Sequence, residues 1–220
     1  MRSRKLKYLR YNIGDDHPNI LIDAVHAHAP RADKYTGEIV ECVANTTGCN
    51  CIIGTVSRDV ADLNRPIDKS GNPEANKEYR NTIRSILMEH NLLDSEQKLK
   101  EPFLHLAIHG MKDSHQIDVE LGTRHRKTCS PEIRTWLKKQ FEQWADSFTE
   151  KRPIIGMDQH FVGDSSKAFH RHGTDSYLGY GEHFNTVQIE FSHWLRLNYR
   201  KEVLDLLNQV VSNFNDFIQS

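Results

Sequence analysis

The sequence predicts one α/β domain with three layers (αβα), in which helices cover both faces of a mainly parallel or mixed central sheet. Short apolar runs of strand length alternate with longer stretches whose apolar residues recur at helical spacing, an order typical of α/β proteins. The 220 residues are enough to bury one sizeable core. No repeat, low-complexity tract or linker divides the chain, so we expect a single domain over residues 1–220.

In the first half of the chain we expect strand 19–25, helix 36–48, strand 51–56 and helix 74–93. Both strands are continuous apolar runs. The first helix is expected to have Thr36 as its N-cap and to close at Gly48, a residue suited to the position after a helix. The second helix carries one apolar stripe, formed by Tyr79, Ile83, Ile86 and Leu87.

In the second half we expect strands at 103–109, 118–122, 153–156 and 187–191, a helix beginning at Ser130 and a final helix over about 199–219. Ser130 can cap its helix and Pro131 suits the first turn, and apolar residues then recur at helical spacing as far as Trp144. The last segment carries apolar residues at helical spacing and should cover the sheet.

Composition limits the classes of function. Hydrophobic residues make up 37% and charged residues 27% of the chain, as in ordinary soluble globular proteins. A formal charge of -1 gives no electrostatic reason to expect nucleic acid or an anionic membrane as a partner. No run approaches the roughly 20 apolar residues of a membrane span, and no apolar segment follows the basic start. We therefore expect a cytoplasmic protein whose four cysteines are reduced thiols.

An unusual concentration of charge follows the strand at 51–56. The stretch 57–66, with the sequence Ser-Arg-Asp-Val-Ala-Asp-Leu-Asn-Arg-Pro, holds two arginines, two aspartates and an asparagine. Charged groups at the end of a buried strand are costly unless they pair with each other or with a ligand. Arg65 beside Asn64 offers the fork geometry that binds a carboxylate, whereas Arg58 and Asp62 are expected to brace the loop.

Polar side chains follow several of the predicted strands at their carboxyl ends, where ligands bind in open α/β sheets. The groups expected at this edge are His26, His28, Asp33 and Glu38, then Arg58, Asp62, Asn64 and Arg65, and finally His109 and Glu190. Two imidazoles and one carboxylate are the ligand set of many hydrolytic zinc sites. A second carboxylate near a metal-bound water can act as a general base.

These residues resemble the N-formylglutamate amidohydrolase family, whose distant relatives include zinc carboxypeptidases and zinc poly-γ-glutamate hydrolases. The resemblance rests on four pieces in order: the histidine-containing loop before Thr36-Gly-Glu-Ile-Val40, the motif from Ser57-Arg58 to Asp62-Leu-Asn-Arg65, the His109-Gly turn, and Val187-Gln-Ile-Glu190. The segment Asp118-Val-Glu-Leu-Gly-Thr-Arg124 is also similar to one that follows the family's second metal histidine. The resemblance implies a zinc-carboxypeptidase-like fold.

Carried over by position, the resemblance implies one zinc ion per chain with His28, Asp33 and His109 as ligands and Glu190 as the general base. It also implies that Asn64 and Arg65 bind a substrate carboxylate and that Arg58 and Arg124 make secondary anion contacts. The residues themselves make Arg124, or a member of the predicted loop 169–174, a candidate for stabilising the oxyanion. His172 of that loop is expected to contact the substrate. The expected reaction is hydrolysis of the amide of a small carboxylate-bearing N-acyl or N-formyl amino acid.

Two alternatives stay open in the ligand set. The family's first loop is usually rich in glycine after the histidine, whereas this chain has His26-Ala-His-Ala-Pro-Arg31, so either His26 or His28 is a candidate ligand. Glu38 is an alternative to Asp33. Alternative functions are a diverged, non-catalytic anion-binding module of the same fold, a metallopeptidase or a γ-glutamyl hydrolase. The substrate and the oligomeric state are left undefined by the sequence.

Overall fold

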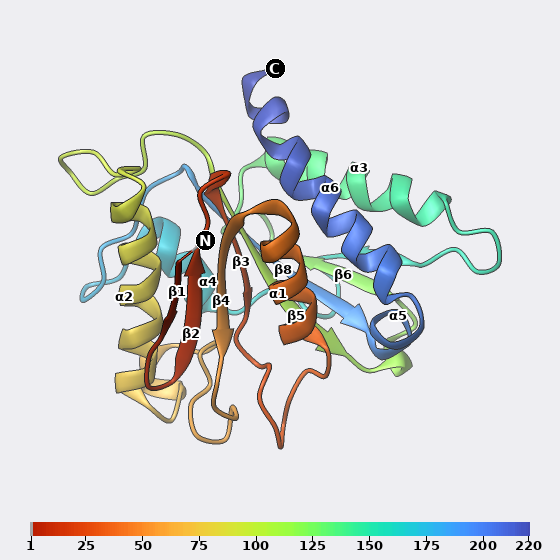
Figure 1. Ribbon diagram of the computed structural model, residues 1–220, viewed down its shortest axis with the longest axis horizontal. Coiled ribbons are helices and arrows are strands. Elements are labelled where there is room, and N and C mark those ends of the chain that lie inside the picture. Colours follow the sequence, from red (N-terminus) through yellow and green to blue (C-terminus); the bar gives the residue numbers. More distant parts are fainter. Residues whose placement is uncertain (1) are drawn as a thin grey trace.

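A mixed eight-stranded sheet runs through the protein in the computed structural model, which describes residues 2–220 (Figure 1). Its strands, in spatial order, are β1 (Arg2–Lys5), β2 (Leu9–Ile13), β4 (Cys49–Gly54), β3 (His17–Ala24), β5 (Phe103–Met111), β8 (Phe184–Ser192), β6 (Val119–Gly122) and β7 (Ile155–Met157). The four neighbouring strands β4, β3, β5 and β8 are parallel. Their carboxyl ends therefore meet along one edge of the sheet.

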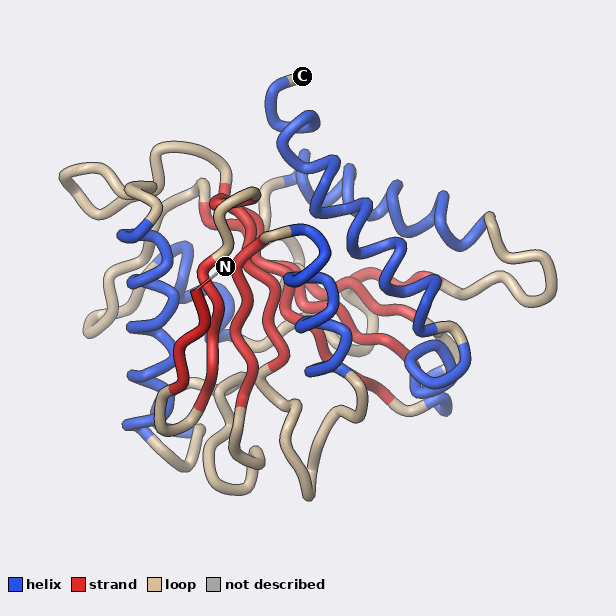
Figure 2. Tube along the Cα trace, in the orientation of Figure 1, coloured by secondary structure: helices blue, strands red, loops and turns tan. Residues whose placement is uncertain are grey.

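Helices cover both faces of the sheet (Figure 2). One face carries α1 (Thr36–Thr47), α3 (Pro131–Asp146) and α6 (Arg200–Gln219), and the other carries α2 (Pro73–Glu89) and α4 (Ser165–His172). Ile20 and Ile22 of β3 pack in the first of these cores and Leu21 in the second, because successive residues of a strand point to opposite faces. This arrangement confirms the predicted three-layer α/β fold with a mixed sheet.

The predicted elements between residues 17 and 219 are present, with small shifts at their ends. Thr36 is the first residue of α1 and not its N-cap, which is Tyr35; the Thr36 hydroxyl donates to the carbonyl of Asp33 at 2.7 Å. Helix α2 ends at Glu89, four residues before the predicted end, and Asn91 then takes a left-handed backbone conformation with φ of 53°. Gly48 closes α1 with φ of 70°, as its position predicted.

The β1–β2 hairpin, helix α4 and the short helix α5 (His193–Asn198) have no counterpart in the prediction. The hairpin of β1 and β2 extends one edge of the sheet, and its first strand has the polar sequence Arg-Ser-Arg-Lys, which gives no apolar pattern. Helix α4 buries Ser166, Lys167, His170 and Arg171, so hydrophobic periodicity could not reveal it. Within residues 2–220, none of the helices is both long and apolar enough to cross a membrane.

A buried arginine ties the carboxyl ends of the strands to the loop before α1. Arg196, on the short helix α5 (His193–Asn198), donates to the carbonyls of Phe191 at 3.0 Å, of Met111 at 3.1 Å and of Lys34. Its guanidinium lies against Gly110, where an added Cβ would meet the guanidinium carbon at 2.4 Å. Packing therefore explains why a glycine follows His109, since only glycine at position 110 leaves space for the Arg196 side chain.

We expect Arg196→Met to lower the free energy of unfolding by about 3 kcal/mol, because three carbonyls lose charged hydrogen bonds in a region that water does not reach. Chemical denaturation measures the change. The matched control is Arg152→Met, which removes an ion pair with Asp146 in which both side chains are exposed, and should cost less than about 1 kcal/mol. Equal losses in the two variants would contradict this role of Arg196.

Candidate active site

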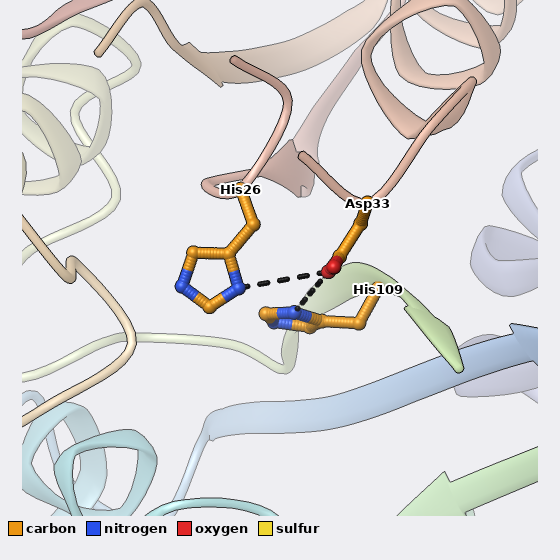
Figure 3. A group of neighbouring side chains, drawn as sticks. All are labelled: His26, Asp33 and His109. Atoms are coloured by element: carbon orange, nitrogen blue, oxygen red, sulfur yellow. Dashed lines mark hydrogen bonds and ion pairs between the residues drawn. The ribbon is translucent and has the colours of Figure 1, made fainter. Parts of the chain in front are cut away.

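Two histidines and an aspartate meet at the carboxyl edge of the parallel strands (Figure 3). His26 lies just beyond β3, Asp33 lies in the loop before α1, and His109 lies near the end of β5. The Nδ1 atoms of His26 and His109 are 3.6 Å and 3.3 Å from the same Asp33 oxygen, Oδ2. The three potential ligand atoms lie within 4.8 Å of one another, so one metal ion could contact all three.

Neighbouring charged groups hold this cluster from outside. His26 Nε2 is 2.7 Å from Asp62 Oδ1, and the same carboxylate oxygen accepts from the backbone N–H of Asn64 at 3.0 Å. Arg58 donates to the second Asp33 oxygen, Oδ1, at 2.6 Å. With its proton on Nε2, His26 directs the lone pair of Nδ1 toward Asp33 and His109, and the carboxylate partner fixes that orientation, as is common for metal-binding histidines.

The donor set fits a divalent ion such as zinc. Neutral imidazoles and a carboxylate are ligands that zinc accepts. Two buried ring atoms, His26 Nδ1 and His109 Nε2, have no hydrogen-bond partner within residues 2–220. For His26 the unpartnered atom is the one that faces Asp33, so its lone pair is available to a cation. Nδ1 of His109 also faces Asp33, and the cluster can therefore offer three donor atoms to one point.

The charges of the cluster shift the pKa values of its members in opposite directions. Burial raises the pKa of Asp33, but the interactions of its carboxylate with the His109 and His26 rings outweigh burial and hold that pKa well below its usual range. Burial lowers the pKa of His109 to about 4, whereas Asp33 and Asp62 overcome burial and raise the pKa of His26. A cation bound at this cluster would therefore compete with a proton at His26 more strongly than at His109.

A second carboxylate lies beside the cluster on the next strand. Glu190 of β8 is in register with His109 of β5, and its side chain is buried. Gln188, two residues earlier on the same strand, donates to Glu190 Oε1 at 3.0 Å. Burial and the negative charge of Asp33 raise the pKa of Glu190 to about 7. A carboxylate that titrates near neutral pH can both accept and return a proton, as a general base requires.

These groups line one cavity of about 750 Å³. Seven of the residues predicted for the site line it, namely Asp33, Arg58, Asn64, Arg65, His109, Arg124 and Glu190. The Arg65 guanidinium pairs with Asp164 at 2.6 Å, and Asn64 donates to Gln188 Oε1 at 3.3 Å. Among residues 2–220 the side chains of Lys112 and Arg124 make no hydrogen bond or ion pair, although both line the cavity. Positive charge thus remains available to an anionic ligand.

His28 and Glu38, both candidate metal ligands in the sequence, lie outside the cavity. His28 is exposed, its Nδ1 is 2.7 Å from the carbonyl of Ala29, and it lines a separate depression together with Glu38. The reason is local: the N–H of Asp33 donates to the carbonyl of His26 at 2.8 Å, which closes the loop and leaves the residues between them outside. The structure therefore favours His26 over His28, and Asp33 over Glu38, which pairs with Arg200 on the surface.

His172 is also outside the cavity. It ends α4, its side chain is 48% exposed, and its Nε2 is 2.8 Å from the carbonyl of Lys127. The prediction treated 169–174 as a loop, but residues 169–172 are helical and the helix turns His172 away from the cavity. The substrate contact predicted for His172 therefore has no counterpart in the lining of this cavity.

Sequence reasoning missed Gln188, Lys112 and Asp164, all of which line the cavity. A signal for Gln188 was present: within Val187-Gln-Ile-Glu-Phe191 it alternates with apolar residues and shares a face with Glu190. Asp164 was visible only as a capping residue, and it caps α4 by accepting from the N–H of Ser166 at 2.9 Å.

Comparison with known proteins shows the fold. No protein-family model matches the sequence, and no curated protein does. The N-formylglutamate amidohydrolase of Ralstonia eutropha JMP134 superposes with a TM-score of 0.67 at 11% identity, over 96% of this chain and 99% of that one. A bacteriophage poly-γ-glutamate hydrolase gives a TM-score of 0.57 at 11% identity, over 95% of this chain and 90% of that one.

A third structure, the succinylglutamate desuccinylase of Chromobacterium violaceum, gives a TM-score of 0.52 at 13% identity. It covers 93% of this chain, which spans 64% of the desuccinylase. The fold expected from the sequence motifs is thereby confirmed, because the chain shares its architecture with the N-formylglutamate amidohydrolase and poly-γ-glutamate hydrolase structures over nearly its whole length. At these identities the likeness establishes the fold, and the activity has to be argued from the site.

The raised pKa of Glu190 predicts a pH-dependent effect of Glu190→Gln on the metal-free protein. Between its ordinary value of 4.5 and about 7, the unfolded chain has lost the Glu190 proton and the folded protein keeps it. Rising pH in this window therefore destabilises the wild type and leaves the glutamine variant unaffected at this site. The free energy of unfolding of Glu190→Gln, relative to that of the wild type, should therefore increase as the pH rises to about 7 and then level off.

Denaturation of chelator-treated protein at several pH values measures this difference. Glu101→Gln, at an exposed glutamate outside the cavity, is the matched control and should show no comparable trend. A difference between wild type and Glu190→Gln that is independent of pH would contradict the buried, charge-repelled environment described above.

Proposed function

We propose that the protein is a zinc-dependent amidohydrolase that cleaves the amide of a small carboxylate-bearing N-acyl or N-formyl amino acid. The observation that carries the proposal is the buried cluster of His26, Asp33 and His109, which opens into the same cavity as Glu190 and several cationic side chains. The reactions named for the structurally similar N-formylglutamate amidohydrolase and poly-γ-glutamate hydrolase belong to the same class, hydrolysis of an amide near a carboxylate.

His26, Asp33 and His109 are the residues that would hold the metal. A zinc ion bound there would polarise the scissile carbonyl and bring the pKa of a bound water toward 7. Asp62 contributes by keeping His26 in the orientation that points Nδ1 inward, and Arg58 contributes by fixing the Asp33 carboxylate. The chain thus provides both the ligands and the groups that orient them.

Glu190 is proposed as the general base. It accepts one proton of the attacking water, whose oxygen bonds to the carbonyl carbon, and returns that proton to the nitrogen as the C–N bond breaks. Its burial suits this role because a poorly hydrated carboxylate is a stronger proton acceptor than an exposed one. Gln188 holds the carboxylate in place by donating to Oε1. Arg124, which lines the cavity and has no hydrogen-bond or ion-pair partner within residues 2–220, is the candidate for stabilising the oxyanion.

Asn64 and Arg65 are proposed to bind the substrate carboxylate and its neighbouring amide. The Asn64 side-chain oxygen is buried without a hydrogen-bond partner within residues 2–220, and it can accept an N–H of the substrate. Arg65 is 48% exposed, and a ligand carboxylate can compete with Asp164 for its guanidinium. Holding the substrate at its anionic end turns binding energy into orientation of the amide toward Glu190.

The ligand assignment predicts different zinc contents for two histidine variants. Wild type and His28→Ala, purified without added zinc, should each hold about one zinc ion per chain. His26→Ala should hold far less, because it removes a ligand, whereas His28 lies on the exposed loop. Elemental analysis gives the contents. A normal zinc content in His26→Ala would contradict the assignment, and a zinc-free wild type that addition of zinc does not restore would favour a non-catalytic binding module.

Glu190→Gln should lower kcat for an N-formyl or N-acyl amino acid by about 10²- to 10⁴-fold, since general-base catalysis contributes on that order. Zinc content should stay near that of wild type, because Glu190 is not in the ligand cluster. A panel of N-formyl, N-acetyl and γ-glutamyl amino acids supplies the substrates, with Glu101→Gln as the control. Near-normal turnover by Glu190→Gln would exclude Glu190 as the base.

A further inference from the structure

A second cleft lies next to the cavity described above and contains a buried cation that forms no ion pair within residues 2–220. The cleft has a volume of about 610 Å³, and Pro66, Ile67, Pro73, Arg80 and Phe169 are among its lining residues. Arg80, on α2, is only 7% exposed. Within residues 2–220 its side chain makes no hydrogen bond and no ion pair. The carboxylate in the lining, Asp68, is exposed and does not come within the 4.0 Å of an ion pair with Arg80.

Two aromatic rings lie against the Arg80 guanidinium. The guanidinium carbon is 4.5 Å from the centre of the Tyr177 ring and 5.5 Å from that of Phe169. Burial lowers the pKa of Arg80, and the titratable groups that oppose this effect are phenols, not carboxylates. None of its nitrogens is among the fully enclosed, unpartnered atoms of residues 2–220, so the N–H edge reaches the cleft. A guanidinium held by aromatic rings and without a hydrogen-bonding partner within residues 2–220 keeps its fork of donors free for an anion.

The arrangement differs from that of the half-buried Arg58 and the buried Arg171. Arg58 pairs with Asp33, and Arg171 pairs with Glu182 and contacts Asn185. A buried cation is costly without a compensating anion, and a bidentate carboxylate is the partner that fits guanidinium geometry. Arg80 thus has the donors, the position and the unsatisfied charge of an anion-binding residue.

The cleft and the catalytic cavity share their walls. Arg65 lines the cavity and Pro66 lines the cleft, and α4 presents Asp164 to the cavity and Phe169 to the cleft. The ion pair between Arg65 and Asp164 therefore lies where the two spaces adjoin. Asn76, one turn before Arg80 on α2, donates to the carbonyl of Arg65 at 2.8 Å and so fixes the distance between the two arginines.

We propose that Arg80 forms a second carboxylate-binding site, which receives a further carboxylate of an acidic substrate longer than one amino-acid unit. On this view the first carboxylate lies at Asn64 and Arg65, and the next units of the ligand cross the Arg65–Asp164 pair into the cleft. The path through the cavity rests on the proposed function, whereas the anion site at Arg80 does not. A chain of glutamate units linked through their side chains is the probe with the right chemistry, since each unit carries a free carboxylate.

Calorimetric binding to the full, zinc-containing chain tests the site, with Glu190→Gln as the common background so that the probe is not turned over. The probes are γ-linked tri-glutamate, free glutamate and inorganic phosphate. Arg80→Gln and Arg80→Met should each weaken binding of tri-glutamate about tenfold, the loss expected for one charged hydrogen-bonded contact. Binding of glutamate should change less than about twofold, because it fills only the first site.

The control is Arg84→Gln, one turn further along α2. It removes the same charge from an exposed side chain whose partner is Gln97, and it should leave the affinity for tri-glutamate unchanged. Near-ultraviolet circular dichroism reports whether the Arg80 variants keep their packing. If they do not, Ser176→Asp keeps the test decisive: Ser176 is exposed in the cleft wall, and a carboxylate there should compete for Arg80 and weaken tri-glutamate alone.

Unchanged affinity for tri-glutamate in folded Arg80 variants would overturn the proposal, as would an equal loss in Arg84→Gln. Phosphate binding that depends on Arg80 while tri-glutamate binding does not would overturn the carboxylate assignment. Because binding is read out without turnover, an Arg80-dependent affinity would stand even if no amide were hydrolysed, and failure of the proposed function would remain separate from failure of this site.

Discussion

One largely buried carboxylate, that of Asp33, determines the geometry of the site. Its two oxygens face different partners: Oδ1 accepts from Arg58, and Oδ2 faces the imidazoles of His26 and His109. These partners come from loops and strands that are distant in sequence, so the carboxylate joins the ends of β3, β4 and β5. An ionised carboxylate that is 11% exposed is tolerable only with such partners, and removing it would leave Arg58 and the two rings without their common anion.

The negative charge of Asp33 also affects the pKa of Glu190, the second acid in the cavity. Asp33 lies close enough to Glu190 to raise its pKa, while its own pKa is held low by the histidines. Two carboxylates in one cavity are thereby pushed apart in pKa, which is how active sites give two acids different roles. A cation held by His26, Asp33 and His109 would offset the repulsion and favour the ionised form of Glu190, the form that a base needs. In the proposed function, metal binding and readiness of the base are therefore linked.

The sequence predicted the central fold because its signals are local. Apolar runs indicate the parallel strands, and the concentration of charged residues in 57–66 indicates a loop at the end of a strand. The choice between His26 and His28 was not local, since it depends on the backbone bond from Asp33 that closes the loop. Helix α4 was not predicted for a related reason. Its buried face is polar and is stabilised by contacts from distant segments, such as the pairing of Arg171 with Glu182 and Asn185. Such contacts leave no hydrophobic periodicity in the sequence.

In the proposed function Arg65 binds a substrate carboxylate, but its guanidinium is already paired with Asp164, and the strength of this ion pair decides whether a ligand can replace Asp164. Arg65 is 48% exposed and Asp164 15%, so solvent screens the pair and its contribution is on the order of 1 kcal/mol or less. Asp164 also has a second anchor, because its other oxygen, Oδ1, accepts from the N–H of Ser166 and caps α4. Loss of Arg65 would therefore leave Asp164 satisfied and α4 intact. A ligand carboxylate can take over the guanidinium at low cost, which lets Arg65 stay oriented toward the cavity when it is empty and still bind substrate in the proposed reaction.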